Sequence, residues 1–231
     1  MGNGIQNIFA EVPKTYELVN HTLTLGMDIV WRKKAVAIAA RRGGERWIDV
    51  CSGTGETANY LSRAAGNGTR VFATDFSMPM LEYALTKPEA HRITFCLSDI
   101  RQLPFEDNSF DLVTLSFATR NINLNREILT ESFREFYRIL RPGGCFINLE
   151  TSQPTSPVAR RLFHLYVKLF VKRVGQLLSG SKAGYTYLSR TIPRFYDADE
   201  LAGILRMAGF DEVRYRRLML GAAAIHESVK R

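Results

Sequence analysis

The sequence predicts an α/β fold in which helices cover both faces of a mostly parallel sheet. Short apolar runs alternate with helical stretches from Trp47 to Leu149, which is the pattern of strands joined by crossover helices. A glycine-rich turn, Ser52-Gly53-Thr54-Gly55, directly follows the first apolar run. Parallel strands cannot be joined by a tight hairpin, so this alternation favours a parallel sheet. The 231 residues suit one domain of ordinary size.

Five strands are expected before residue 150. They are the runs Trp47–Cys51, Arg70–Thr74, Ile93–Leu97, Phe110–Leu115 and Cys145–Leu149. Helices are expected between them: one reaches Ala65, one begins at Pro79, and one spans 125–140. Proline suits a first helical turn, because the N–H that it lacks would have no partner there. The third helix is expected to end at Arg141-Pro142-Gly143-Gly144.

The segments outside this alternation are expected to cap the site and to complete the sheet. Residues 1–41 are predicted to form an N-terminal helical cap, with a helix over Val30–Ala40 that ends at two arginines and two glycines. Residues 151–196 are predicted to form a helical lid insertion over the active face. A helix over 197–208 should precede two strands, 213–217 and 218–226, that pair antiparallel at the sheet edge. We therefore predict a single domain over residues 1–231.

Charge and cysteine content narrow the class of protein. The net charge of +8 favours a polyanionic neighbour, either nucleic acid or an anionic membrane, and charge alone does not choose between them. The three cysteines are odd in number and widely spaced, so we predict a reduced, cytoplasmic protein without a metal centre. No apolar run is long enough to span a membrane, and residues 1–11 lack the features of a signal peptide.

Glycines and acids recur where the predicted strands end, which is where ligands bind in such sheets. Gly53 and Gly55 let the backbone approach a ligand closely, and Asp49 lies just before them. Asp75 ends the second strand, where a carboxylate can hold both hydroxyls of a ribose. Asp99 follows the third strand and can accept a hydrogen bond from an adenine amine.

Two cofactors compete for this pattern, a nicotinamide dinucleotide and S-adenosylmethionine. The stretch Gly53–Ala58 satisfies the loose G-x-G-x-x-A pattern of dinucleotide sites. Asp49, however, suits the ammonium of S-adenosylmethionine, and Glu56 would place a negative charge beside a pyrophosphate. Asp99 followed by Leu103-Pro104-Phe105 also recurs after the third strand of methyltransferases. The sequence therefore favours S-adenosylmethionine, and the alternative without a ligand is a glycine-rich turn beside three solvated acids.

Further motifs are spread over almost the whole chain. They are Ile8-Phe9 through Tyr16, Asn20, Gly26 to Trp31-Arg32, Asp49 to Gly55, Leu103-Pro104-Phe105, Asp107 to Asp111, Phe117 with Arg120-Asn121, Arg141 to Gly144, Tyr185 to Ser189, and Gly221 to His226. Together they resemble the ubiquinone/menaquinone biosynthesis C-methyltransferases. The resemblance implies a Rossmann-like class I methyltransferase fold, with a seven-stranded, mostly parallel sheet that has an antiparallel edge strand.

The resemblance also implies the residues of the site. The implied cofactor contacts are Asp49, Gly53, Thr54, Gly55, Asp75, Phe76, Asp99, Ile100 and Ser116. The implied acceptor residues are Tyr16, Asn20, Arg120 and Asn121, which would face the ring of a prenylated quinol such as demethylmenaquinol. Arg120 would stabilise the phenolate, with Tyr16 and Asn121 completing the hydrogen bonds. His226 is the candidate proton acceptor, although a histidine near a terminal strand is also often structural.

Four positions depart from the pattern of this family. They are Glu17 where aspartate is usual, Asp28 where many members have histidine, Thr119 in place of leucine, and Ser52 in place of glycine or cysteine. These departures concern the identity of the substrate that accepts the methyl group more than the methyl-transfer reaction itself. Without the resemblance, Tyr16 and Arg120 would be interpreted as a packing residue and a surface ion-pair partner.

The stretch 159–178 combines basic and apolar residues at helical spacing. Arg161, His164, Lys168 and Lys172 lie near one stripe, while leucines and aromatic residues lie on others. Such a helix can lie in a membrane interface, which would suit a lipid-soluble quinol, or it can be a lid with an apolar inner face. Both interpretations stay open, as does a homodimer.

Three other functions compete with quinol methylation. The first is a methyltransferase for another small lipid or aromatic metabolite, and the second is a non-catalytic protein that binds the cofactor. The third is a basic RNA-binding or RNA-modifying protein, but the chain has no aromatic stacking motif of the RRM kind. It also lacks an Asn/Asp-Pro-Pro-Tyr/Phe motif after the fourth strand, where residues 116–119 are Ser-Phe-Ala-Thr. We therefore predict no nucleic-acid partner.

Overall fold

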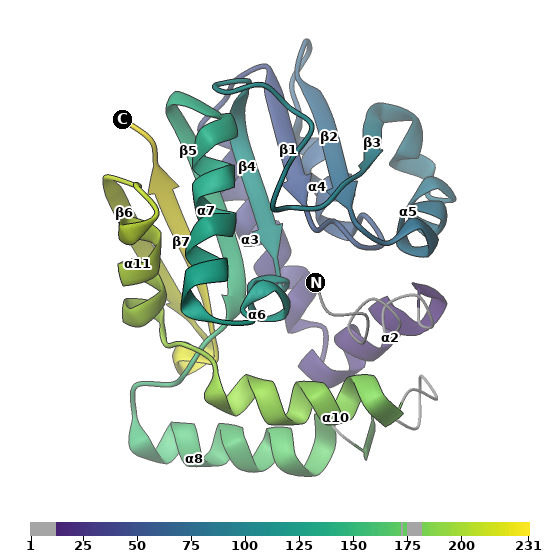
Figure 1. Ribbon diagram of the computed structural model, residues 1–231. Coiled ribbons are helices and arrows are strands. Elements are labelled where there is room, and N and C mark those ends of the chain that lie inside the picture. The colour runs from purple at the N-terminus through teal and green to yellow at the C-terminus, as the bar shows by residue number, and fades with distance from the viewer. Residues whose placement is uncertain (1–12, 172, 175–181) are drawn as a thin grey trace.

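A seven-stranded sheet forms the centre of the protein (Figure 1). The structure is a computed structural model and describes residues 13–171, 173–174 and 182–231. The strands are β1 (Arg46–Val50), β2 (Arg70–Asp75), β3 (Ile93–Leu97), β4 (Phe110–Ser116), β5 (Leu140–Thr151), β6 (Glu212–Leu218) and β7 (Ala223–Val229). They lie in the order β3-β2-β1-β4-β5-β7-β6. The predicted α/β fold with a mostly parallel sheet is confirmed.

The last two strands form the predicted antiparallel pair, but the second begins at Ala223 and not at residue 218, because the helical turn Met219–Gly221 connects them. β7 lies between β5 and β6 and runs antiparallel to both. The outermost strand is therefore β6, and the antiparallel strand is one position inside the edge. β7 is hydrogen-bonded on both sides and none of its residues is exposed, whereas β6 exposes Arg214, Arg216 and Arg217.

The fifth strand begins earlier than the sequence predicted. The segment Arg141–Gly144, which was expected to end the preceding helix, belongs to β5. Gly143 N donates to Lys230 O at 2.7 Å, and Lys230 N donates to Gly144 O at 3.0 Å, so the end of the chain pairs with this segment. The pairing of β5 with β4 shifts register between Phe110 and Leu112. A Pro-Gly-Gly sequence thus forms an irregular start to a strand here, because a distant strand end supplies its hydrogen bonds.

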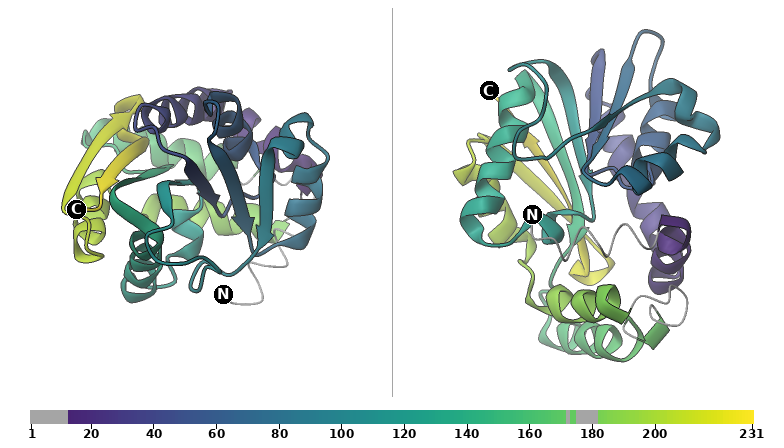
Figure 2. Two further views of the ribbon diagram at one scale, coloured as in Figure 1. Left: turned by 90° about the horizontal axis from the view of Figure 1, so that it is seen from above. Right: turned by 45° about the vertical axis from the view of Figure 1, so that its right-hand side comes forward.

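Helices cover both faces of the sheet (Figure 2). The helices are α2 (Pro13–Thr24), α3 (Met27–Ala40), α4 (Glu56–Ala64), α5 (Met78–Leu85), α6 (Thr119–Ile122), α7 (Arg126–Ile139), α8 (Pro157–Tyr166), α10 (Lys182–Thr191) and α11 (Ala198–Met207), with short helical turns η1 (Pro88–Arg92), η2 (Val167–Val171), η3 (Ile192–Arg194) and η4 (Met219–Gly221). Helices α3 and α4 pack on one face of the sheet, whereas α7 and α11 pack on the other. Pro79 lies in the first turn of α5, as predicted.

The segment predicted as a lid forms a layer of its own. Helices α8 and α10 lie side by side beyond the end of the sheet where β4 and β5 finish, next to α2 (Figure 1). A separate apolar cluster of Val167, Val171 and Ile192 holds this layer, and Leu23 of α2 packs against it. The predicted long helix over 159–178 is α8 followed by one π-helical turn, and residues 172 and 175–181 lie outside the described part. The part of the predicted loop 180–184 that is described belongs to α10.

Substitution of Phe146 by alanine should destabilise the fold strongly. The Phe146 ring is fully buried and packs against Phe133, Phe136 and Phe210, with ring centroids 5.3–5.7 Å apart. Truncation of a phenylalanine in a close-packed core costs about 3–5 kcal/mol. Urea unfolding of Phe146→Ala should show this loss, and Leu85→Ala, at a side chain that is 56% exposed, should show far less. A loss below about 1 kcal/mol for Phe146→Ala would contradict this packing.

Candidate active site

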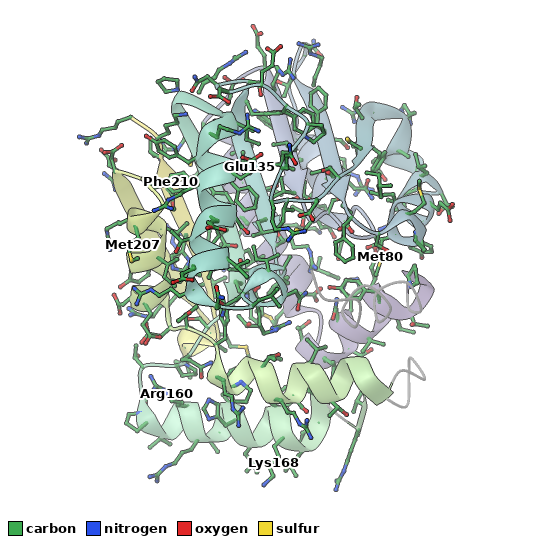
Figure 3. All side chains as sticks on the ribbon, in the orientation of Figure 1. Met80, Glu135, Arg160, Lys168, Met207 and Phe210 are labelled. Carbon is green, nitrogen blue, oxygen red and sulfur yellow. The ribbon has the colours of Figure 1, made fainter. Side chains whose placement is uncertain are left out.

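A pocket opens where β1 and β4 end, and α2 and α3 contribute to its wall. These two strands are neighbours, but their connections leave toward opposite faces of the sheet, which creates a crevice between them. The pocket is lined by Tyr16, Arg32, Asp49, Cys51, Ser52, Gly53, Thr54, Glu56, Thr57, Asp75, Phe76, Met80, Ser116, Phe117, Ala118, Asn121 and Ile122. Figure 3 labels Met80, which lies on α5 near α2.

Asp49 brings a buried carboxyl group to the floor of this pocket. It lies in β1, is 1% exposed, and accepts a hydrogen bond of 2.6 Å from the Thr114 hydroxyl of the adjacent strand. Burial raises the pKa of Asp49 to about 7, because ionisation in a poorly solvated site is costly, while Thr114 and Arg32 oppose the shift. A cation bound beside Asp49 would therefore stabilise the ionised form of its carboxyl group.

Asp75 connects the end of β2 to the glycine-rich turn. Its carboxylate accepts hydrogen bonds from Gly53 N at 2.8 Å and Ser77 N at 2.9 Å. Its side chain is buried, and burial raises its pKa against the effect of these bonds. A carboxylate has about four acceptor positions, so lone pairs remain for a ligand in the pocket. Gly53 has φ of +55°, a conformation that glycine adopts without strain.

Two residues at strand ends hold strained backbone beside the pocket. Cys51 directly follows β1 with φ of +51°, and Phe117 directly follows β4 with φ of +57°. Side chains other than glycine seldom adopt such angles, and those that do concentrate at functional sites. Phe117 is held by a 2.7 Å hydrogen bond from its N–H to Leu149 O and by the Arg32 guanidinium 4.8 Å above its ring.

A buried cluster of charges, which the sequence reasoning did not anticipate, forms the wall beneath α3. Arg32 donates to Asp28 Oδ2 at 2.7 Å, and its Nε lies 3.4 Å from Glu56 Oε2. His21 Nδ1 lies 2.9 Å from the same Asp28 oxygen. The Arg32 guanidinium therefore lies between two carboxylates, and burial raises the pKa of Glu56 although Arg32 counteracts it. Arg32 was part of a recognised motif, but only the fold shows that it borders the pocket.

Two of the four predicted acceptor residues line the pocket, and the other two interact with neighbouring side chains. Tyr16 of α2 and Asn121 of α6 both line it. Burial raises the pKa of the Tyr16 hydroxyl, which hydrogen-bonds the Asn20 side chain and lies within the electrostatic influence of Arg120. Arg120 is 7% exposed, and it donates from Nη1 to the Thr151 hydroxyl at 3.1 Å and pairs with buried Glu150 at 3.7 Å.

Several predicted residues lie outside the pocket lining. They are Asn20, Gly55, Asp99, Ile100, Arg120 and His226. Asp99 faces Arg101 instead, and this guanidinium holds the pKa of its carboxyl below the ordinary value. Gly55 begins α4, and Ile100 is buried in the core.

His226 lies apart from the pocket, on the face of β7 covered by α11. Its Nε2 hydrogen-bonds Ala198 O at 2.9 Å, and the Tyr215 ring is 5.5 Å away. Burial lowers the pKa of His226 to about 4, so the imidazole is neutral near neutral pH. Because His226 does not line the pocket, we leave it out of the proposed catalytic group. Its hydrogen bond to Ala198 O connects β7 to the start of α11, which is a structural role.

The donor set fits S-adenosylmethionine. Asp49 offers a carboxylate for an ammonium, and Asp75 offers one for ribose hydroxyls. The Ser52 hydroxyl lines the pocket and is buried without a hydrogen-bond partner among the described residues, so it is available to a ligand. A side chain at Gly53 would meet no neighbour within 4 Å, which leaves this part of the turn open to a ligand.

The stability of the ligand-free protein should depend on pH through Asp49. Its pKa is about 7 in the folded state, above the ordinary value of 3.8, so its contribution to stability is full below pH 4 and is lost as pH rises through 7. Between pH 5 and 8, the wild type should therefore lose about 2–3 kcal/mol relative to Asp49→Asn. Urea unfolding of both proteins at each pH measures this difference, and parallel pH profiles would show that Asp49 ionises normally.

Comparison with known protein families supports the interpretation of this site. Residues 2–230 match the model of the ubiE/COQ5 methyltransferase family. A ubiquinone/menaquinone biosynthesis C-methyltransferase UbiE of Ruegeria sp. (strain TM1040) is 34% identical over 230 residues, covering 98% of this chain and 90% of the relative. A demethylmenaquinone methyltransferase of Roseiflexus castenholzii (strain DSM 13941 / HLO8) is 36% identical over 227 residues, covering 98% and 93%.

Solved structures share the fold at low sequence identity. A putative methyltransferase of Haloferax volcanii, in complex with the Trm112 activator, has a TM-score of 0.64 at 19% identity and covers 94% of this chain and 97% of its own. A SAM-dependent methyltransferase of Aquifex aeolicus has a TM-score of 0.55 at 18% identity, with coverages of 81% and 82%. The whole-chain match and the buried carboxyl groups at the ends of β1 and β2 lead to one conclusion: the chain belongs to the ubiE/COQ5 methyltransferase family and is an S-adenosylmethionine-dependent methyltransferase.

Proposed function

We propose that this enzyme methylates a ring carbon of a prenylated quinol, of the demethylmenaquinol type, in quinone biosynthesis. The names of the Ruegeria and Roseiflexus relatives, at 34% and 36% identity over almost the whole chain, support this acceptor class. The pocket supports it independently, because the side that Tyr16 and Asn121 line carries polar groups suited to a ring with hydroxyls. A quinol ring presents both a hydrogen-bond donor and an acceptor.

One observation carries the proposal: adjacent residues 120 and 121 leave a buried donor and a buried acceptor unsatisfied. Arg120 Nε and Asn121 Oδ1 have no hydrogen-bond partner in the part of the chain that the structure describes. Buried polar atoms are normally paired, and unpaired ones need an explanation. A quinol would satisfy both, since its ionised oxygen accepts from Arg120 and its hydroxyl donates to Asn121.

Arg120 would make the ring carbon nucleophilic by stabilising the phenolate. The Arg120 backbone N–H donates to Glu150 Oε2 at 3.1 Å, and Glu150 and Thr151 together hold the Nη1 end of its side chain. A guanidinium fixed in this way is preorganised and needs little rearrangement as charge develops on the ring oxygen. Tyr16, with its raised pKa, stays protonated and can donate a second hydrogen bond.

Residues of the glycine-rich turn and the strand ends would hold the cofactor. We propose that Asp49 and Thr54 contact its amino-acid part, and that Asp75 holds the ribose. When bound, S-adenosylmethionine supplies a methyl group to the electron-rich ring carbon and leaves as a neutral thioether, while the ring carbon loses a proton. Asp99 and Ile100 do not line the pocket, so the contacts implied for them stay predictions.

Substitution of Arg120 should reduce turnover without loss of cofactor binding. In an assay with methyl-labelled cofactor and chemically reduced demethylmenaquinol, Arg120→Met should lower kcat by about 10²–10³-fold, as removal of a preorganised oxyanion donor does. Arg134→Met, at an exposed arginine of α7, is the matched control and should keep wild-type turnover. Cofactor binding by calorimetry should be the same in all three proteins.

The outcome also separates the alternatives for the acceptor. Label in the ring of the extracted quinol supports C-methylation of this class. No label, with cofactor binding intact, would overturn the quinol acceptor and favour another small lipid or aromatic metabolite. Wild-type turnover in Arg120→Met would remove Arg120 from the catalytic group.

We further propose that the enzyme is cytoplasmic and reaches its lipid-soluble acceptor through membrane contact by α8 and η2. Among the described residues no helix is long and apolar enough to cross a membrane. Val158, Leu162, Leu165 and Leu169 follow one another at helical spacing and are 38–67% exposed. Basic side chains belong to the same segment: Figure 3 shows Lys168 at the outer side of this layer, whereas Arg160 donates from Nε to Pro154 O at 2.8 Å. An apolar stripe with basic neighbours suits the interface of an anionic membrane.

Removal of this stripe should weaken binding to anionic vesicles. The double variant Leu162→Ser, Leu165→Ser should sediment at least about fivefold less with vesicles of phosphatidylglycerol and phosphatidylcholine. The reason is that it lacks two leucine side chains that would insert into the apolar part of the membrane interface. Leu85→Ser, at a leucine of α5 that is 56% exposed, is the matched control. Equal vesicle binding by all proteins, or none by the wild type, would contradict the membrane contact and leave these helices as a lid.

A further inference from the structure

Glu17 joins three segments that lie far apart in the sequence. It belongs to α2, and its Oε1 accepts a hydrogen bond of 2.5 Å from the Thr54 hydroxyl in the glycine-rich turn. The same oxygen is paired with the ammonium of Lys87, which follows α5.

The bond to Glu17 determines how Thr54 presents its oxygen to the pocket. A threonine hydroxyl has one proton and two acceptor lone pairs. Because Thr54 gives its proton to Glu17, its Oγ1 can only accept from any third group. Thr54 is 3% exposed and lines the pocket, so a ligand group that donates a hydrogen bond to its Oγ1 would lie in the pocket.

Asp49 is arranged in the same way on the other side of the turn. It accepts the Thr114 proton at 2.6 Å, and Thr114 thus offers the pocket no donor. The end of the pocket around Asp49 and Thr54 therefore presents acceptors. Such a surface fits the cationic ammonium of an amino acid and disfavours an anionic group.

We propose that Glu17 is a positioning residue for the cofactor: it holds the Thr54 hydroxyl as an acceptor for the ammonium of S-adenosylmethionine. Lys87 keeps the Glu17 carboxylate in place. This inference rests on the cofactor contact proposed above for Thr54. It also links the two halves of the site, because Glu17 is adjacent to Tyr16 on α2.

A double-mutant cycle on cofactor binding tests the inference. The dissociation constant of S-adenosylmethionine is measured by calorimetry for the full-length wild type, Glu17→Ala, Thr54→Val and the double variant. Each single substitution should weaken binding about tenfold, since a hydrogen bond to a charged group contributes roughly that factor. The double variant should bind no more weakly than Thr54→Val, because Glu17 acts through the hydroxyl.

Two further variants separate positioning from a structural role. Glu17→Gln keeps an oxygen that accepts the Thr54 proton, so it should retain binding within about threefold of the wild type. Glu89→Ala removes another acid, paired with Arg63 outside the pocket lining, and should leave the dissociation constant unchanged. Melting temperatures of all variants, measured without cofactor, show whether the fold is intact.

The outcomes are distinct from those of the acceptor assay. Equal losses from Glu17→Ala in the wild-type and Thr54→Val backgrounds, or no loss in the wild-type background, would overturn the inference. Unchanged binding by Thr54→Val would overturn the Thr54 contact and the inference with it. Coupling between the two positions supports the inference even where no label reaches demethylmenaquinol, since the cycle does not involve the acceptor.

Discussion

The site depends on the adjacency of β1 and β4, whose connections leave toward opposite faces of the sheet. In a parallel sheet the carboxyl ends of all strands meet at one edge, and a crevice forms where the strand order changes direction. Asp49, Asp75 and Phe117 come from three different strands or strand ends and meet only for this reason. The helices α2 and α6 then supply the walls that carry Tyr16 and Asn121.

Burial of charge at this crevice is the second constraint. Asp49 and Asp75 both have pKa values raised by burial, so the fold loses stability in order to hold carboxyl groups where water is scarce. Arg32 offsets part of this cost, because it lowers the pKa of Asp49 and of Glu56. The strained backbone at Cys51 and Phe117 belongs to the same pattern, since strain at strand ends persists where surrounding contacts hold it.

The connection between the cofactor turn and the acceptor side explains why the N-terminal helix belongs to the site. Tyr16 faces the pocket, and Glu17 in the same helical turn holds Thr54. The layer of α8, η2 and α10 packs against this helix, and the Tyr166 hydroxyl hydrogen-bonds Leu23 O. An element from the beginning of the chain is thereby held by elements from its later half.

The sequence by itself determined the strands and the cofactor class, because local patterns encode both. The predicted run Ile93–Leu97 coincides with β3, and Asp49, Thr54, Asp75 and Ser116 line the pocket as expected. Only the tertiary structure decided the features that depend on distant partners. Pairing with Lys230 placed Arg141–Gly144 in a strand, and the start of α11 supplied the hydrogen-bond partner of His226 Nε2. Arg32 contacts Glu56, and Glu17 contacts Thr54; both partners are more than twenty residues away in the sequence. The periodicity of a single segment does not encode such contacts.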